Sequence, residues 1–193
     1  DPVRFITNHS SGKMGFALAK NAMLRGAEVT LVMGKCDSEP PVFANTVKVQ
    51  SAKDMYDAVI ERADSMDIIV KAAAVADYRP KNVSSEKVKK QDGNMSIELE
   101  RTDDILKTLG ERKNGQFICG FSMETENMLE NSRKKLEKKN CDMIVANNLK
   151  QDGAGFGGNT NIVTLITKDD EVQLEKMTKD EVAEKIFDFI LSR

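Results

Sequence analysis

Residues 8–15 read Asn-His-Ser-Ser-Gly-Lys-Met-Gly, a run of small and polar residues that leads directly into a helical pattern. From Lys13 to Arg25 the apolar residues recur every three or four positions, which predicts a helix with one buried face, and Gly26 is a natural stop. The N–H groups of a first helical turn are unpaired and carry partial positive charge, so the stretch predicts an anion site. A capped helix without a ligand explains the same residues equally well.

Short β-branched runs then alternate with amphipathic segments. Strands are expected at 28–33, 46–49, 67–74, 116–121 and 142–146, and helices from Ser51, from Thr102, over 124–139 and from Thr178, with these Ser and Thr residues as caps. This order predicts an α/β fold with a Rossmann-like, doubly wound, mostly parallel sheet, formed by residues 1–193 as one domain. Because a strand precedes the loop of a βα unit, we expect the first strand upstream of Asp1.

Three segments depart from this alternation. Residues 94–100 alternate apolar with polar, which predicts a strand with one exposed face. Residues 162–167 and 172–174 flank a polar turn and predict a hairpin. Residues 151–161 are rich in Gly and Asn and predict a loop.

The composition excludes several classes of protein. The 29 basic and 31 acidic side chains nearly cancel, so the net charge favours neither nucleic acid nor an anionic membrane as a partner. No apolar run is long enough to cross a bilayer. Three widely spaced cysteines and a single histidine argue against a Cys/His metal centre, and they favour a reducing, cytoplasmic location.

Ligands of open α/β sheets bind beyond the carboxyl ends of the strands. Those ends are expected at 73–77, 120–121 and 147–148, and the opening loop should lie on the same rim, which predicts one nucleotide-sized site. A Rossmann-like NAD(P) oxidoreductase would require Gly-x-Gly-x-x-Gly in the loop that opens the first helix, which residues 8–15 lack, although part of the motif would lie in the upstream strand. A nucleotide-binding module without catalytic activity stays open as a second alternative.

Two groups of lysines each allow two interpretations, a solvated surface or a ligand contact. Residues 87–90 include three lysines, which form either a solvated surface or a flap that brings ammonium groups to a phosphate. Lys135 and Lys139 are four residues apart and so share one helix face, for solvation or for ligand binding.

Five strings of the sequence together resemble one family. Residues 1–15, 73–79, 86–90, 120–125 and 146–147 are similar, in the right order and over most of the chain, to bacterial phosphopantothenate–cysteine ligases. In many bacteria this ligase domain is fused to a flavin-dependent phosphopantothenoylcysteine decarboxylase domain. The resemblance therefore implies such a decarboxylase domain as a candidate fusion partner.

The resemblance also implies a reaction in coenzyme A biosynthesis. The family joins 4′-phosphopantothenate to L-cysteine, and its bacterial members use CTP and Mg²⁺ and pass through an acyl-cytidylate, releasing pyrophosphate and CMP. No ligand of the metal is assigned. The family forms homodimers through an added antiparallel segment, for which the residues near Asn94 and Ile162 are candidates; alternatively these strands complete the sheet of one subunit.

Site residues are implied position by position. Asn8 resembles the asparagine that contacts the pantothenate carboxyl and steadies the acyl-nucleotide, and Lys87 resembles a flap lysine placed against the phosphates; these two are the implied catalytic residues. The acyl substrate is implied to lie against Asn8, Ser10, Ser11, Gly12, Ala73 and Ala74. The implied nucleotide-binding residues are Asp77, Lys87, Asp103, Asp104, Ile105, Leu106, Phe121, Lys135 and Lys139. At 102–103 the sequence departs from the family, with Thr-Asp in place of Asn-Pro.

Overall fold

A computed structural model describes residues 1–36, 39–90, 92–124, 126–148 and 158–193. The helices are α1 (Lys13–Leu24), α2 (Ala52–Arg62), the 3₁₀ helix η1 (Ala63–Ser65), α3 (Ile105–Arg112), α4 (Met128–Lys138) and α5 (Lys179–Leu191). The strands are β1 (Thr30–Met33), β2 (Asn45–Lys48), β3 (Ile68–Lys71), β4 (Tyr78–Pro80), β5 (Leu99–Arg101), β6 (Phe117–Glu124), β7 (Met143–Asn148), β8 (Thr160–Asn161), β9 (Val163–Ile166), β10 (Glu171–Gln173) and β11 (Met177–Thr178). Most of the loop predicted at 151–161 lies outside the described residues. Within the described ranges, no helix is both long and apolar enough to span a bilayer.

The central sheet has five strands in the order β10-β9-β7-β6-β3. Strands β3, β6 and β7 are parallel, as predicted, whereas β9 runs antiparallel to β7 and β10 antiparallel to β9. The predicted hairpin is therefore confirmed, but the sheet is mixed rather than mostly parallel. The segment near Ile162 completes this chain's own sheet. Its strand β9 pairs with the edge of β7 and is therefore used within the chain.

Two smaller sheets accompany the central one. Strands β1 and β2 pair in parallel, with Leu31 opposite Thr46 and Val32 opposite Val47. Strands β11 and β8 form a short antiparallel pair just before α5.

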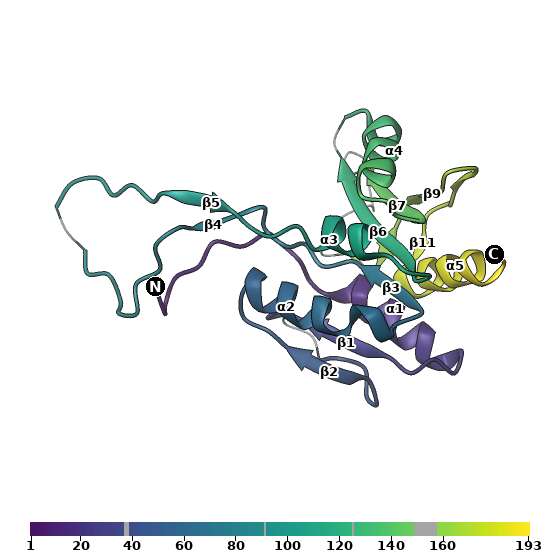
Figure 1. The fold of residues 1–193 in the computed structure, drawn as a ribbon, viewed down its shortest axis with the longest axis horizontal. Helices are drawn as coiled ribbons and strands as arrows, with labels where there is room; N and C mark the ends of the chain where they lie inside the picture. Colours follow the sequence, from purple (N-terminus) through teal and green to yellow (C-terminus); the bar gives the residue numbers. More distant parts are fainter. Residues whose placement is uncertain (37–38, 91, 125, 149–157) are drawn as a thin grey trace.

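Side chains of alternating direction on the central strands build two apolar cores. On β7, Met143 and Val145 pack with α1, α5 and β9, whereas Ile144 packs with α2, α3 and α4. Successive side chains of a strand point to opposite faces, so a strand between two cores contributes to both of them. Helices therefore cover both faces of the sheet, as a doubly wound fold requires (Figure 1).

The predicted helix caps are right at two of three positions. Ser51 and Thr178 both form capping boxes, with Asp54 and Glu181 as the reciprocal acceptors. At α3 the prediction of Thr102 is wrong. The cap is Asp104, whose carboxylate accepts the Lys107 N–H at 2.9 Å.

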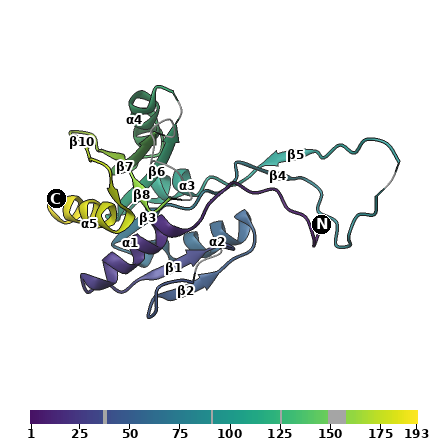
Figure 2. The ribbon, with the colours of Figure 1, turned by 180° about the vertical axis from the view of Figure 1, so that it is seen from behind.

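Strands β4 and β5 form an antiparallel ribbon that continues into residues 81–90 and 92–98 and extends away from the body of the molecule (Figure 1). We call residues 78–90 and 92–101 the arm. The strand predicted over 94–100 is limited here to Leu99–Arg101, because β4 offers only Tyr78, Arg79 and Pro80 as partners. The N-terminal segment runs beside the arm in both views (Figures 1 and 2).

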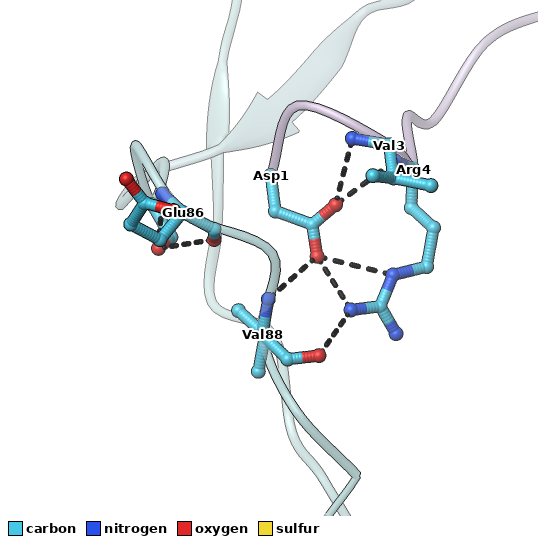
Figure 3. A network of polar contacts seen from close by, with 6 residues as sticks. Asp1, Val3, Arg4, Glu86 and Val88 are labelled. Atoms are coloured by element: carbon cyan, nitrogen blue, oxygen red, sulfur yellow. Dashed lines mark hydrogen bonds and ion pairs between the residues drawn. The ribbon is translucent and has the colours of Figure 1, made fainter.

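Asp1 fastens the N-terminal segment to the arm (Figure 3). One of its carboxylate oxygens accepts the Val3 and Arg4 N–H groups, and the other accepts the Val88 N–H at 3.2 Å and the Arg4 guanidinium. Arg4 also donates to the Val88 carbonyl at 2.7 Å. Only 4% of the Asp1 side chain is exposed, so this contact fixes the backbone next to Lys87.

Helix α3 approaches the end of α4 closely at Gly110. A Cβ added to Gly110 would lie 1.8 Å from the Lys139 carbonyl oxygen, which leaves no room for a side chain. Gly15 in α1 is also helical, but an added Cβ there would have no neighbour within 4 Å.

We expect Gly110→Ala to lower the free energy of unfolding by about 1–3 kcal/mol through overpacking. Gly15→Ala should instead raise it by about 0.5–1 kcal/mol, because alanine reduces the conformational freedom of the unfolded chain. Urea denaturation of both variants measures the difference. Equal effects at the two positions would contradict the close contact between α3 and Lys139.

Candidate functional site

A cleft of about 600 Å³ lies at the carboxyl end of β3, between the end of β5, the start of α3 and one side of α4. Its lining residues are Lys71, Val75, Ala76, Asp77, Tyr78, Arg101, Thr102, Asp103, Asp104, Ile105, Leu106, Asn131, Lys134, Lys135, Lys138 and Lys139. This is the edge at which ligands of parallel α/β sheets bind. Its volume is within the range of small-molecule sites.

The charge of the lining favours an anionic ligand. Six lining side chains are basic, namely Lys71, Arg101, Lys134, Lys135, Lys138 and Lys139, and three are acidic, namely Asp77, Asp103 and Asp104. The whole chain carries a net charge of −2, so the excess of cations is local to the cleft. Concentrated cations in a concave site attract polyanions such as nucleotide phosphates.

The first turn of α3 opens into the cleft. Ile105 and Leu106 are buried and line it, and their backbone N–H groups belong to the unpaired donors of a helix start. Asp104 caps this turn and also pairs with the Lys139 ammonium group. Burial raises the pKa of Asp104, but the hydrogen bonds from Lys139 and from the Lys107 N–H outweigh burial and bring its pKa below the ordinary value.

Helix α4 supplies the opposite side. The Lys135 ammonium donates to the Phe121 carbonyl at 2.9 Å, which ties α4 to β6 next to the cleft. Burial lowers the pKa of Lys135 below its ordinary value, although Glu124 and Asp104 oppose the shift. The helix thus presents partly desolvated cations, and such cations attract an anion more strongly than solvated ones.

The segment after β3 is held in place by two residues from elsewhere in the chain. Thr102 donates its N–H to the Asp77 carbonyl at 3.0 Å and its hydroxyl to the Ala76 carbonyl at 2.7 Å. The Asn8 side-chain amide donates to the Val75 carbonyl at 3.4 Å. Asn8 therefore lies at the border of the cleft although it does not line it.

The structure brings together most of the nucleotide-binding residues predicted from the sequence. Those that line the cleft are Asp77, Asp103, Asp104, Ile105, Leu106, Lys135 and Lys139. Phe121 does not line it and takes part only through the carbonyl that accepts from Lys135. Lys87 is exposed on the arm and does not line the cleft of its own chain.

The predicted acyl-substrate residues are less concentrated. Ser10 is exposed, Ser11 and Gly12 lie at the start of α1, and Ala73 packs against the core that contains α3. Gly12 caps α1 with φ of 74°, a conformation that favours glycine. Neither these residues nor Ala74 line the cleft, whereas Asn8 contacts the lining residue Val75 through its side-chain amide.

Among the charged and amide side chains of the lining, sequence reasoning missed five: Lys71, Arg101, Asn131, Lys134 and Lys138. Lys71 left a signal, because it is a charged residue that follows the apolar run Ile68–Val70 inside the strand predicted over 67–74. Lys134 and Lys138 have the same four-residue spacing as Lys135 and Lys139. Arg101 and Asn131 left no signal that separates them from solvated residues.

Comparison with known proteins places these features in a family. The family described as DNA/pantothenate metabolism flavoprotein C-terminal domain matches residues 1–193. The coenzyme A biosynthesis bifunctional protein CoaBC of Bacillus subtilis (strain 168) is 54% identical over 170 residues, which are 88% of this chain and 42% of that protein. A protein of an unknown prokaryotic organism, named cysteine/cysteine sulfinic acid decarboxylase, is 46% identical over 195 residues, which are 100% of this chain and 54% of that protein. The chain thus spans about half the length of these relatives.

Solved structures agree with the sequence relatives. The crystal structure of the C-terminal domain of the coenzyme A biosynthesis bifunctional protein CoaBC is 49% identical and has a TM-score of 0.83, covering 98% of this chain and 86% of that one. The DNA/pantothenate metabolism flavoprotein of Streptococcus pneumoniae is 25% identical with the same TM-score, covering 100% of this chain and 93% of that one. The chain therefore belongs to the family of the DNA/pantothenate metabolism flavoprotein C-terminal domain.

Proposed function

We propose that the chain is a ligase that joins 4′-phosphopantothenate to L-cysteine through an acyl-cytidylate, in coenzyme A biosynthesis. The observation that supports it is the cation-rich cleft, which gathers seven residues predicted to bind the nucleotide at one edge of the sheet. Its relatives include bifunctional coenzyme A biosynthesis proteins, of which it matches the C-terminal domain. The decarboxylase domain implied by the family resemblance is a possible fusion partner.

The first step would activate the acid. A carboxylate oxygen of phosphopantothenate attacks the α-phosphorus of CTP, the bond to the β-phosphate breaks, and pyrophosphate leaves. Negative charge develops on the phosphoryl oxygens, and Lys135 together with the first-turn N–H groups of α3 would stabilise it. Asn8, beside Val75, would hold the reacting carboxyl with a neutral amide, which leaves the carboxylate nucleophilic.

Magnesium fits the donor set of the cleft. Mg²⁺ is usually held by one or two carboxylates together with substrate phosphates. Asp77 and Asp103 are exposed carboxylates on the cleft lining and would hold it, whereas Asp104 is engaged by Lys139 and by the start of α3. The ion would offset the charge of the triphosphate. Within the described residues, no group of three or more His, Cys, Asp or Glu side chains is placed to hold a metal ion.

The second step would form the amide. The amine of cysteine attacks the acyl carbon, the bond to the phosphate oxygen breaks, CMP leaves, and the ammonium proton is released. The acyl-cytidylate must be kept from water until the amine arrives, and the cleft between α3 and α4 is the place where it would be held.

The position of Lys87 leads us to propose a homodimer. The arm and the N-terminal segment expose apolar side chains that a single chain leaves uncovered, including Phe5 at 73%, Met95 at 64% and Ile97 at 51%. A second copy would cover them, and the arm would then bring Lys87 to the cleft of the partner subunit. The antiparallel segment near Asn94 suits this contact, since the segment near Ile162 is used within the chain.

The activity is tested by incubating the protein with CTP, Mg²⁺, phosphopantothenate and cysteine. We expect pyrophosphate release that requires phosphopantothenate, followed by CMP and the amide product when cysteine is present. Pyrophosphate and CMP are measured by coupled assays and the amide by mass spectrometry. CTP binding without any turnover would contradict the ligase and favour the binding module, and NAD(P)H oxidation would favour the oxidoreductase.

A mixing experiment tests the origin of Lys87. Lys87→Gln and Asp77→Asn should each be inactive as pure proteins, but mixed dimers contain one cleft with both residues intact if Lys87 acts on the partner subunit. Unfolding and refolding the two variants together should then restore about a quarter of the wild-type rate, because half of the dimers are mixed and each has one intact site. No recovery in a mixture that still forms dimers would show that Lys87 does not act across the dimer.

Ile97→Asp should weaken the dimer, because a carboxylate in an apolar contact between copies is desolvated. Light scattering coupled to size-exclusion chromatography should show the wild-type protein at twice the 21.4 kDa chain mass and the variant shifted toward the monomer. Leu191→Asp, at an exposed residue of α5 on the body, serves as the control and should stay dimeric. The arm contact is wrong if Ile97→Asp remains a dimer at low micromolar concentration.

A further inference from the structure

Lys71 is a lysine at the end of an otherwise apolar strand. It follows Ile68, Ile69 and Val70 in β3 and pairs in register with Gly120 of β6. Its side chain lines the cleft, and the residue is only partly exposed. The cation therefore enters the cleft from the sheet itself, whereas the other lysines of the lining come from α4.

Other lysines of the cleft have protein partners. Lys135 donates to the Phe121 carbonyl, Lys139 pairs with Asp104, and Lys134 pairs with Glu130 at 2.6 Å. In the part of the chain that the structure describes, the Lys71 ammonium makes neither an ion pair nor a hydrogen bond. A largely desolvated cation without a partner costs stability, so it does not hold this fold together.

The surroundings of Lys71 agree with this view. Burial lowers the pKa of Lys71 below its ordinary value, and Lys135 and Lys139 lower it further, while Asp104 and Asp77 oppose them. These four charged groups come from the α3 cap, the segment after β3, and α4. An anion placed among Lys71, Lys135 and the α3 N-terminus would remove the mutual repulsion of the lysines.

We propose that Lys71 binds the phosphate chain of the nucleotide from the sheet side of the cleft. The inference rests on the proposed nucleotide chemistry and adds a residue to it. Lys71 ends β3 at the carboxyl edge of the sheet, close to the first-turn donors of α3, where a phosphate chain in this cleft would receive backbone N–H groups and an ammonium group together. The contact is to phosphate charge and not to the base, so it is independent of which nucleoside is bound.

The test compares Lys71→Met and Lys71→Arg with Lys107→Met. Lys107 is on α3, its side chain is 55% exposed and its ammonium pairs with Glu111, so its replacement is a matched loss of one charge outside the cleft. Calorimetric titration with CTP, inorganic pyrophosphate and cytidine separates phosphate from base contacts. Lys71→Met should weaken CTP and pyrophosphate by at least about tenfold, the loss of one charge-assisted hydrogen bond. Cytidine binding should be unchanged, Lys71→Arg should retain most of the affinity, and Lys107→Met should match the wild type.

Thermal unfolding provides the second measurement. Lys71→Met should unfold at the same or a higher temperature, because it removes a buried charge that has no partner. Pyrophosphate and CTP affinities within twofold of wild type in Lys71→Met would overturn the proposal. So would an equal loss of cytidine binding together with a lower unfolding temperature, which indicates a structural role. If the wild type shows no ligase turnover but Lys71→Met loses pyrophosphate binding, the ligase proposal fails and the role of Lys71 stands.

Discussion

The parallel pairing of β6 with β3 on one side and with β7 on the other is the arrangement on which the cleft depends. Val70 lies opposite Cys119, and Phe121 lies opposite Val145, so the three strands run in one direction and end at one edge. Glycine at two positions, Gly120 in β6 and Gly110 in α3, allows α3 to lie close to the sheet and to the end of α4. A Cβ on Gly120 would lie 2.7 Å from Leu106, and one on Gly110 would meet the Lys139 carbonyl. The first turn of α3 is therefore held beside lysines that follow it by about thirty positions in the sequence.

Charge in the cleft both supports the fold and costs stability. Asp104 joins two roles, because its carboxylate caps α3 and pairs with Lys139. Burial lowers the pKa values of both Lys71 and Lys135, which means that the folded protein keeps these cations at a cost. Such a cost in stability is common at functional sites, where charged groups are held in position for a ligand.

The arm differs from the body of the molecule in the contacts that stabilise it. It buries little apolar surface against its own chain, and its described contacts near Lys87 are polar ones to Asp1 and Arg4. Those contacts fix the direction of the backbone but leave apolar side chains of the arm exposed, including Met95 and Ile97. An extended ribbon of this kind is stabilised when a further surface covers it, and in the proposed homodimer the arm of one subunit would reach the cleft of the other.

The sequence by itself determined the alternating α/β order, the capping boxes at Ser51 and Thr178 and the hairpin around Asp170. Through the family resemblance it also pointed to seven residues that the structure gathers in the cleft. These features depend on local periodicity, on side chains that cap their own helix, or on motifs that stay contiguous. Only the tertiary structure decided that β9 pairs with β7, that Asp104 rather than Thr102 caps α3, and that Lys71 lies in the cleft while Lys87 does not. Each of these depends on which distant segment lies alongside. Thr102 does not cap α3, because its hydroxyl donates to the Ala76 carbonyl instead. A lysine on a strand or on an arm has the same local pattern whether a cleft lies beside it or solvent does.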